Sequence, residues 1–163
     1  MIYLLAKPSK ILAAISSLLT IMSNPKMKSP NLEDSPADPT YRQYTPSQAE
    51  TYAQHRPSPP PALVELILNH HISTGGQTGV LLDVGCGPGM ATRAFAKHFE
   101  AAIGCGPGES MIQVATEHGG ETANGKSIRW VICTAEEIDK LTEVEPSSVD
   151  LVIVAFAVGI TFL

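Results

Sequence analysis

The sequence predicts an α/β domain built on a doubly wound parallel sheet. From Gly79 onward, short apolar runs alternate with helix-like segments. The apolar runs are continuous, as in strands that are buried on both faces of a parallel sheet. A glycine-rich turn at 85–89 follows the first of these runs and precedes a helical segment. Because ligands bind at the carboxyl ends of the strands in such sheets, this turn is the first candidate for a functional site.

The repeating part of the chain contains seven expected elements. Strands are expected at residues 80–84, 101–105, 128–133 and 149–157. Helices are expected between them at residues 90–99, 109–118 and 135–141. Thr134 and Glu137 have the spacing of a capping box at the start of the last helix. Each of the first three strands is therefore followed by a helix, which is the order of a parallel sheet.

Two more helices are expected before the first strand. Thr45, Pro46 and Gln48 form an N-cap pattern for a helix that runs to Arg56 and ends at Pro57. The next helix should span residues 62–71, and its expected apolar side consists of Leu63, Leu66, Ile67 and Leu68. We interpret His70 and His71 at its end as cations favoured by the helix dipole.

Length, composition and charge limit the possible classes of protein. With 163 residues, 44% hydrophobic and 17% charged, the chain fits one domain with a real core and is no disordered tail. All 16 acidic residues follow residue 32, but only seven of the 11 basic ones do, which gives this part a net charge of −9. We therefore expect no nucleic-acid partner, because such binding depends on Lys and Arg that neutralise phosphates.

The three cysteines, Cys86, Cys105 and Cys133, are odd in number and widely spaced, with no CxxC pair. Each lies in or next to an apolar run. We expect the three cysteines to be small buried apolar residues of a protein in a reducing compartment, and we expect neither a zinc site nor a disulfide.

The N-terminal 44 residues are expected to lie outside the domain. Residues 1–22 form an apolar leader whose uncharged run, 11–22, is shorter than the roughly 20 residues of a membrane span. A secretory or anchor signal, a mitochondrial presequence and upstream sequence before a start at Met22 or Met27 are the alternatives. The last is preferred, which predicts a cytoplasmic protein, with mitochondrial or membrane-associated location as the alternative. Residues 23–44 are a proline-rich arm or linker.

Glycines are needed in the turn at residues 85–89 for steric reasons. They allow a tight turn, and a Cβ there would keep the backbone from closing on a bound cofactor. A dinucleotide fingerprint needs its third glycine at position 90, where this chain has Met90, with Gly89 one residue early. A cofactor with a pyrophosphate bridge is therefore disfavoured, and an NAD-dependent oxidoreductase is the weaker alternative.

Three segments together resemble a known family. They are Leu-Leu-Asp-Val-Gly-Cys-Gly-Pro-Gly at 81–89, Gly-Cys-Gly-Pro-Gly-Glu-Ser-Met at 104–111 and Tyr-Ala-Gln-His-Arg-Pro at 52–57. The sequence resembles the class I S-adenosylmethionine-dependent methyltransferases, in particular the branch that includes trans-aconitate methyltransferases. The resemblance spans about residues 40–155. It implies a Rossmann-like fold, S-adenosylmethionine as cofactor and a small-molecule methyl acceptor, with a carboxylic acid as one candidate.

The complete family fold has seven strands in the order 3-2-1-4-5-7-6, and this chain provides the first four. Residues 45–163 are therefore expected to be the N-terminal, cofactor-binding part of a truncated domain. The fourth strand would form an exposed edge, which predicts poor solubility. A non-catalytic remnant with weak or no cofactor binding remains an alternative.

The resemblance also implies cofactor-binding residues. Asp83 would orient the turn, Arg56 would pair with the methionine carboxylate of the cofactor, and Met111 would pack on the adenine or belong to the core. The remaining implied positions are the turn residues Gly85, Cys86, Gly87 and Gly89 and the adenine-contacting residues Thr134, Ala135 and Glu136.

One position departs from the family pattern. Members usually carry an acid at the end of the second strand that accepts hydrogen bonds from both ribose hydroxyls. This chain has Gly106 there, and Glu109 three residues later is the candidate substitute. We identify no catalytic base, because His55 and His98 lie on expected helices as solvated side chains.

Overall fold

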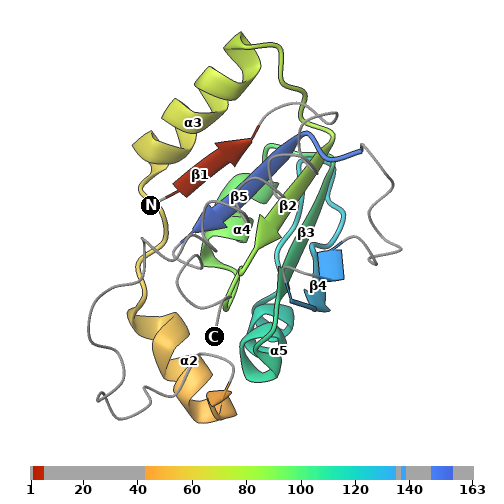
Figure 1. Ribbon diagram of the computed structural model, residues 1–163. Coiled ribbons are helices and arrows are strands. Elements are labelled where there is room, and N and C mark those ends of the chain that lie inside the picture. Colours follow the sequence, from red (N-terminus) through yellow and green to blue (C-terminus); the bar gives the residue numbers. More distant parts are fainter. Residues whose placement is uncertain (1, 6–42, 135–136, 139–147, 156–163) are drawn as a thin grey trace, which may run out of the picture.

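The computed structural model describes residues 2–5, 43–134, 137–138 and 148–155, which form one mixed sheet with helices packed against it (Figure 1). In chain order the elements are β1 (Ile2–Leu5), α2 (Pro46–His55), α3 (Pro61–Ser73), β2 (Val80–Val84), α4 (Met90–Ala96), β3 (Ala101–Gly106), α5 (Glu109–His118), β4 (Arg129–Ile132) and β5 (Leu151–Ala155).

The sheet has five strands in the order β1-β5-β2-β3-β4. The four strands from β2 to β5 pair in parallel, with Leu82 opposite both Ile103 and Val152. Read across the sheet from β4 to β5, these are the third, second, first and fourth of the strands expected from the sequence. The predicted parallel α/β architecture is therefore confirmed. The carboxyl ends of β2, β3 and β4 consequently lie side by side at one edge of the sheet.

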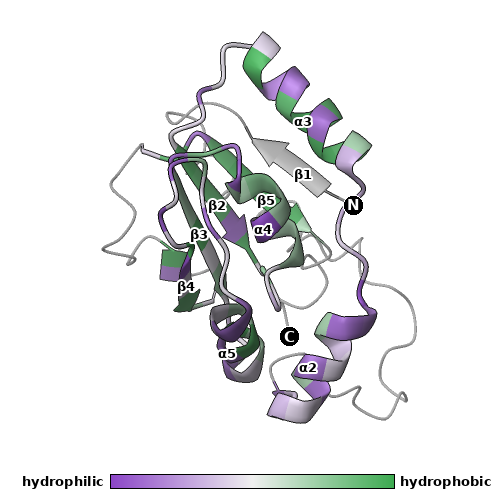
Figure 2. Ribbon diagram, turned by 180° about the vertical axis from the view of Figure 1, so that it is seen from behind, coloured by the Kyte–Doolittle hydropathy of each residue, from purple (hydrophilic) through white to green (hydrophobic). Residues whose placement is uncertain are grey.

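The side chains of β2 and β5 divide the core into two layers, because successive residues of a strand point to opposite faces. Leu81 and Leu151 belong to a cluster that includes Phe95 of α4, whereas Leu82 and Val152 belong to the opposite cluster with Cys133 and others. Seen from behind, α4 lies across the face of the sheet (Figure 2). This buried packing explains why the strand sequences are apolar throughout.

Helix α2 has the predicted capping box. The Gln48 amide donates to Thr45 Oγ1 at 3.3 Å, and the Thr45 amide donates to Gln48 Oε1 at 2.9 Å. The helix ends at the expected place, since Arg56 is its C-cap and Pro57 follows. These reciprocal bonds satisfy amides that the first turn of a helix leaves free.

Helix α3 differs from its predicted orientation. Its buried residues are Val64, Leu68 and His71, whereas Leu66 is 66% exposed. The predicted inward position of Leu66 is wrong, because the inner stripe follows the spacing of residues 64, 68 and 71. His71 is fully buried and donates from Nε2 to the Gln77 carbonyl at 2.7 Å, so its side chain packs into the fold instead of lying free at the end of the helix.

Strand β1 is an addition that the sequence pattern did not predict. It pairs antiparallel with β5, with Tyr3 opposite Val154 and Leu4 opposite Ile153. The prediction that β5 forms an exposed edge is therefore wrong, because both of its sides are paired, to β1 and to β2. Among the described helices, none has both the length and the apolar character that a membrane crossing requires.

The helix expected at residues 135–141 lies almost wholly outside the described residues. Its expected cap is partly seen, since the amide and hydroxyl of Thr134 both donate to Glu137 Oε2 at 3.0 Å. The strand that begins near residue 149 is described as far as Ala155.

Candidate functional site

The turn at residues 85–89 is fastened to the neighbouring strand. The amides of Gly85 and Cys86 both donate to the carbonyl of Cys105 on β3, at 2.8 and 3.0 Å. The Gly89 amide then donates back to the Cys86 carbonyl at 3.0 Å, and α4 begins at Met90. The chain thus reverses tightly between the end of β2 and the start of α4, as the sequence predicted.

Two glycines of this turn have distinct steric roles. Gly89 has a φ of 83°, and a Cβ there would lie 2.3 Å from the Trp130 ring, so glycine is required by the fold itself. Gly87 has a φ of 54°, but a Cβ there would meet no heavy atom within 4 Å. The backbone at Gly87 is therefore open on that side among the described residues, and a ligand has room to approach it.

Asp83 is a buried carboxylate directly before the turn. It is 1% exposed, and its Oδ2 accepts a hydrogen bond from Thr92 Oγ1 at 2.6 Å. Its other oxygen, Oδ1, is buried and has no hydrogen-bond partner among the described residues. Burial raises the pKa of Asp83 to about 7, and the Thr92 hydrogen bonds offset only part of this shift. Thr92 was not predicted as a partner of Asp83. A hydroxyl residue in the first turn of the helix after the glycine turn was the signal that could have identified it.

Cys86 is a protonated thiol in this setting. It is 8% exposed, and burial, with a contribution from the Asp83 charge, raises the pKa of its thiol well above the ordinary value. The thiolate is the reactive form of cysteine, so this side chain is a weak nucleophile. Cys105 and Cys133 are also buried, and all three are free thiols, as expected for small core residues.

The end of β3 has space for a side chain that this chain lacks. A Cβ on Gly106 would lie 3.8 Å from both the Cys86 nitrogen and the Gly85 Cα, which is ordinary contact. Position 106 therefore adjoins the turn, as the resemblance implied. Glu109 is exposed in the first turn of α5, so its carboxylate faces solvent.

The third strand end meets the second. The Cys133 amide donates to the Gly106 carbonyl at 3.1 Å, which places Thr134 next to the end of β3. Thr134 is half-buried, while Ala135 and Glu136 lie outside the described residues.

Met111 belongs to the contact between α2 and α5, and Arg56 lies at the end of α2. Met111 is 3% exposed and packs with Ala49, Ala53 and Val114, so its core role is confirmed, and a contact with adenine stays a prediction. The Arg56 guanidinium lies 5.6 Å from the centroid of the Tyr52 ring on the preceding helical turn.

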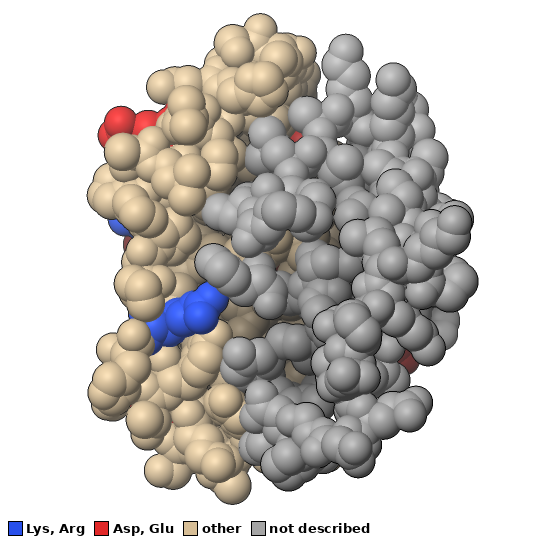
Figure 3. All heavy atoms as spheres, turned by 60° about the vertical axis from the view of Figure 1, so that its left-hand side comes forward, with Lys and Arg blue, Asp and Glu red and all other residues tan. Residues whose placement is uncertain are grey.

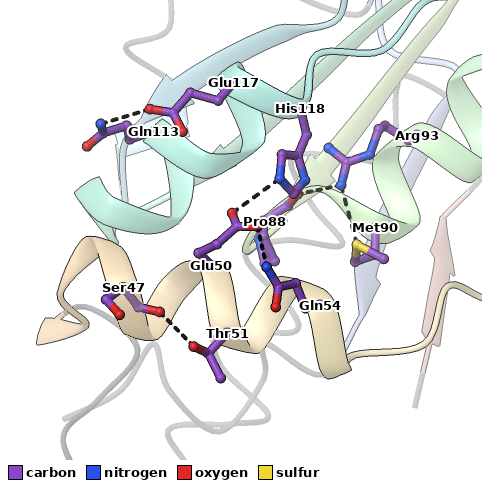
Figure 4. A network of polar contacts seen from close by, with 10 residues as sticks. All are labelled: Ser47, Glu50, Thr51, Gln54, Pro88, Met90, Arg93, Gln113, Glu117 and His118. Atoms are coloured by element: carbon purple, nitrogen blue, oxygen red, sulfur yellow. Dashed lines mark hydrogen bonds and ion pairs between the residues drawn. The ribbon is translucent and has the colours of Figure 1, made fainter.

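A polar contact also links α2 with α5. Nε2 of His118 lies 3.2 Å from Oε2 of Glu50 (Figure 4). Among the residues that the structure describes, no group of three His, Cys, Asp or Glu side chains is arranged to hold a metal ion. On the face drawn in Figure 3, the described surface carries scattered charges rather than a broad basic patch.

Comparison with known proteins gives a family. A model of the methyltransferase domain matches residues 81–162, half of the chain. The chain is 36% identical over 107 residues to the Saccharomyces cerevisiae protein named "Probable S-adenosylmethionine-dependent methyltransferase CRG1", which covers 66% of this chain and 35% of that protein. It is 28% identical over 105 residues to the methyltransferase ptaI of Pestalotiopsis fici, covering 63% of this chain and 27% of that one.

A solved structure is also similar. Its title is "The Structure of a Putative Type II Methyltransferase from Anaeromyxobacter dehalogenans", and it has 29% identity, a TM-score of 0.46 and coverage of 63% of this chain and 37% of that one. The chain spans about a third of the length of the curated relatives it matches. The family match begins at the strand that leads into the glycine turn and includes β2 to β5, so the chain belongs to the methyltransferase-domain family and has its Rossmann-like class I fold.

Proposed function

We propose that residues 45–163 are the cofactor-binding part of an S-adenosylmethionine-dependent methyltransferase that acts on a small molecule. The family match and the Saccharomyces cerevisiae relative, which is named as a probable S-adenosylmethionine-dependent methyltransferase, support this cofactor. One observation carries the proposal. An open glycine turn at the carboxyl end of β2 follows directly on Asp83, a buried carboxylate with one oxygen unbonded among the described residues.

The residues of this turn fit such a cofactor. The space beside Gly87 admits the methionine part of the ligand close to the backbone. The free Oδ1 of Asp83 can accept a hydrogen bond from a water that joins the turn to the ligand. A buried acceptor without a partner costs stability, so a bound group that supplies a donor is favoured at this place.

Chemically, the bound cofactor supplies a methyl group already activated on a sulfonium sulfur. The protein then has to hold and align the reactants and exclude water. The turn provides a rigid backbone for this purpose, because its amides are bonded to the end of β3. Cys86 stays protonated next to the site, so its sulfur does not compete for the methyl group.

The acceptor is proposed to be a small molecule, with a carboxylic acid as the candidate. This finer assignment depends on the Tyr52–Pro57 segment, which resembles the branch that includes trans-aconitate methyltransferases. A carboxylate acceptor needs no strong base. His55 and His98 are exposed, in agreement with their predicted surface positions. A cytoplasmic location and the lack of a nucleic-acid partner stay predictions.

A non-catalytic remnant is the second candidate, and Gly106 is the observation that favours it. Without an acid at this position, two hydrogen bonds to the ribose are lost. Weak or absent cofactor binding would follow unless Glu109 replaces the missing acceptor.

A thermal-shift series separates these candidates. The chain is heated alone and with S-adenosylhomocysteine, sinefungin or NAD, since a ligand that binds only the folded state raises the melting temperature. The proposal predicts a rise with the first two ligands and none with NAD. No rise with any ligand supports the remnant, and a rise with NAD alone contradicts the family-based assignment of the cofactor.

A further inference from the structure

Arg93 of α4 reaches back to the glycine turn from the helix that follows it. Its Nη2 donates to the Pro88 carbonyl at 2.7 Å and lies 3.3 Å from the Met90 sulfur (Figure 4). Pro88 is buried and stands between Gly87 and Gly89. A single guanidinium therefore fixes the orientation of a peptide group in the middle of the turn.

Trp130 of β4 supports this guanidinium. The Arg93 Cζ lies 5.8 Å from the centroid of the Trp130 ring, within the range of a cation–π contact. The ring itself lies against two glycines, because a Cβ at Gly89 or at Gly104 would come within 2.3 or 2.5 Å of it. Trp130 is thus wedged between the turn and β3.

Glycines make the room for both side chains. Gly120 also leaves space for the aliphatic part of the Arg93 side chain, because a Cβ at position 120 would lie 2.8 Å from Arg93 Cγ. Three glycines from separate segments thus surround the Arg93–Trp130 pair. Any side chain at these positions would displace the pair and with it the hydrogen bond to Pro88.

If they served only to fill the core, Arg93 and Trp130 would lower the stability of the fold. Arg93 is half-buried, its Nη1 and the Trp130 Nε1 are buried without hydrogen-bond partners, and no carboxylate of the described residues lies within ion-pair distance of it. A cation removed from water without an acidic partner destabilises a fold, and an apolar side chain would fill the same space at lower cost. What the guanidinium adds is the bond to the turn.

We propose that Arg93, held on Trp130, is a positioning residue that keeps the turn at residues 85–89 in its ligand-binding conformation before the ligand arrives. The inference rests on the proposed function in one respect, namely that this turn binds the cofactor. A turn that is already ordered loses less conformational entropy on binding, which raises the affinity. Arg93 then contributes to affinity without touching the ligand.

Three variants test this role. Arg93→Met keeps the unbranched stem and removes the donors and the charge, Arg93→Lys keeps a donor and the charge, and Lys97→Met removes an exposed cation at the end of the same helix as the control. The first readout needs no ligand. It is amide hydrogen exchange at Gly89, which bonds to the Cys86 carbonyl, compared with Ala101, which bonds to the Gly79 carbonyl at the other end of the sheet.

Arg93→Met is expected to speed exchange at Gly89 by roughly tenfold and to leave Ala101 unchanged, because only the turn loosens. Its affinity for S-adenosylhomocysteine, measured by calorimetry, is expected to fall by about the same factor. Arg93→Lys should recover part of both effects, and Lys97→Met should match the wild-type chain.

Two results would overturn the positioning role. One is unchanged exchange at Gly89, or an equal increase at Gly89 and Ala101, which would mean a general loss of stability. The other is an unchanged affinity of a folded Arg93→Met chain. If the wild-type chain itself fails to bind S-adenosylhomocysteine, the proposed function fails, whereas the exchange experiment still decides whether Arg93 holds the turn.

Discussion

At the scale of single residues, the site depends on how the buried carboxylate of Asp83 is balanced. One oxygen has a strong partner in Thr92, the other has none among the described residues, and burial raises the pKa to about 7. An ionised Asp83 side chain therefore lowers the stability of the fold, because its burial is only partly compensated by hydrogen bonds.

The raised pKa of Asp83 predicts how stability changes with pH. The pKa is 3.8 in the unfolded chain and about 7 in the folded one, so the folded state binds more protons between these values. The contribution of Asp83 to stability is therefore complete below pH 4, declines as pH rises and is lost once pH passes 7, on the order of 4 kcal/mol in all.

Asp83→Asn removes this titration and leaves an oxygen for the Thr92 hydroxyl. Urea unfolding at several pH values should show the variant gaining on the wild-type chain from pH 4 to 7, with a constant difference above that range. Other titrating groups cancel in this comparison. A stability difference that does not change with pH would contradict the buried, ionisable state of Asp83.

Gly106 gives a second prediction at this scale. The space at position 106 accommodates a Cβ in ordinary contact, so Gly106→Asp should fold and place a carboxylate beside the turn. Each charge-assisted hydrogen bond to the ribose is worth roughly 1.5 to 3 kcal/mol, so S-adenosylhomocysteine should bind at least tenfold more tightly.

Gly106→Asn is the matched control for this change. It has the same shape without the charge and should gain less affinity than the aspartate. If Gly106→Asp binds S-adenosylhomocysteine no more tightly than the wild-type chain does, as measured by calorimetry, this would count against a ribose position at the end of β3.

At the scale of secondary-structure elements, the sequence predicted what is local and missed what is distant. The capping box at Thr45, the strand at 80–84 and the helix at 109–118 were predicted with their correct bounds, because caps and periodicity lie within a few residues. The packing of His71 near the Phe99 ring and the stacking of Arg93 on Trp130 depend on contacts between residues far apart in the sequence, and no local pattern contains them.

Strand β1 gives the prediction at the scale of elements. Deleting residues 2–5 would leave the backbone groups of β5 unpaired on one side, and a free apolar edge strand favours pairing between molecules. Light scattering should show a larger mean mass for the deleted chain than for the full chain at equal concentration. An equal mass for both chains would show that β1 does not protect this edge.

At the scale of the whole molecule, the order of the strands determines which residues meet at the candidate site. The strand order β5-β2-β3-β4 brings Asp83, Gly106 and Thr134 to neighbouring strand ends, although they are separated by more than 20 residues in sequence. The glycine turn and Asp83 were predicted from the sequence because strand, turn and helix are consecutive there. Trp130 was not predicted, since only the folded sheet brings β4 to the turn, and Thr92 was missed although it lies in the first turn of α4.

The central claim is that the turn at residues 85–89 binds S-adenosylmethionine, and a matched pair of glycine variants tests it. Gly87 and Gly125 both have a positive φ, and a Cβ at either position would meet no atom within 4 Å. Alanine at either site therefore costs a similar backbone strain, about 1 kcal/mol. Only at Gly87 would the added methyl group stand in the proposed ligand space.

The deciding measurement is a calorimetric titration of the wild-type chain, Gly87→Ala and Gly125→Ala with S-adenosylhomocysteine. We predict binding at one site per chain for the wild type and Gly125→Ala, and a loss of at least tenfold in affinity for Gly87→Ala. Equal affinities for the two variants, or no binding by the wild-type chain, would contradict the claim.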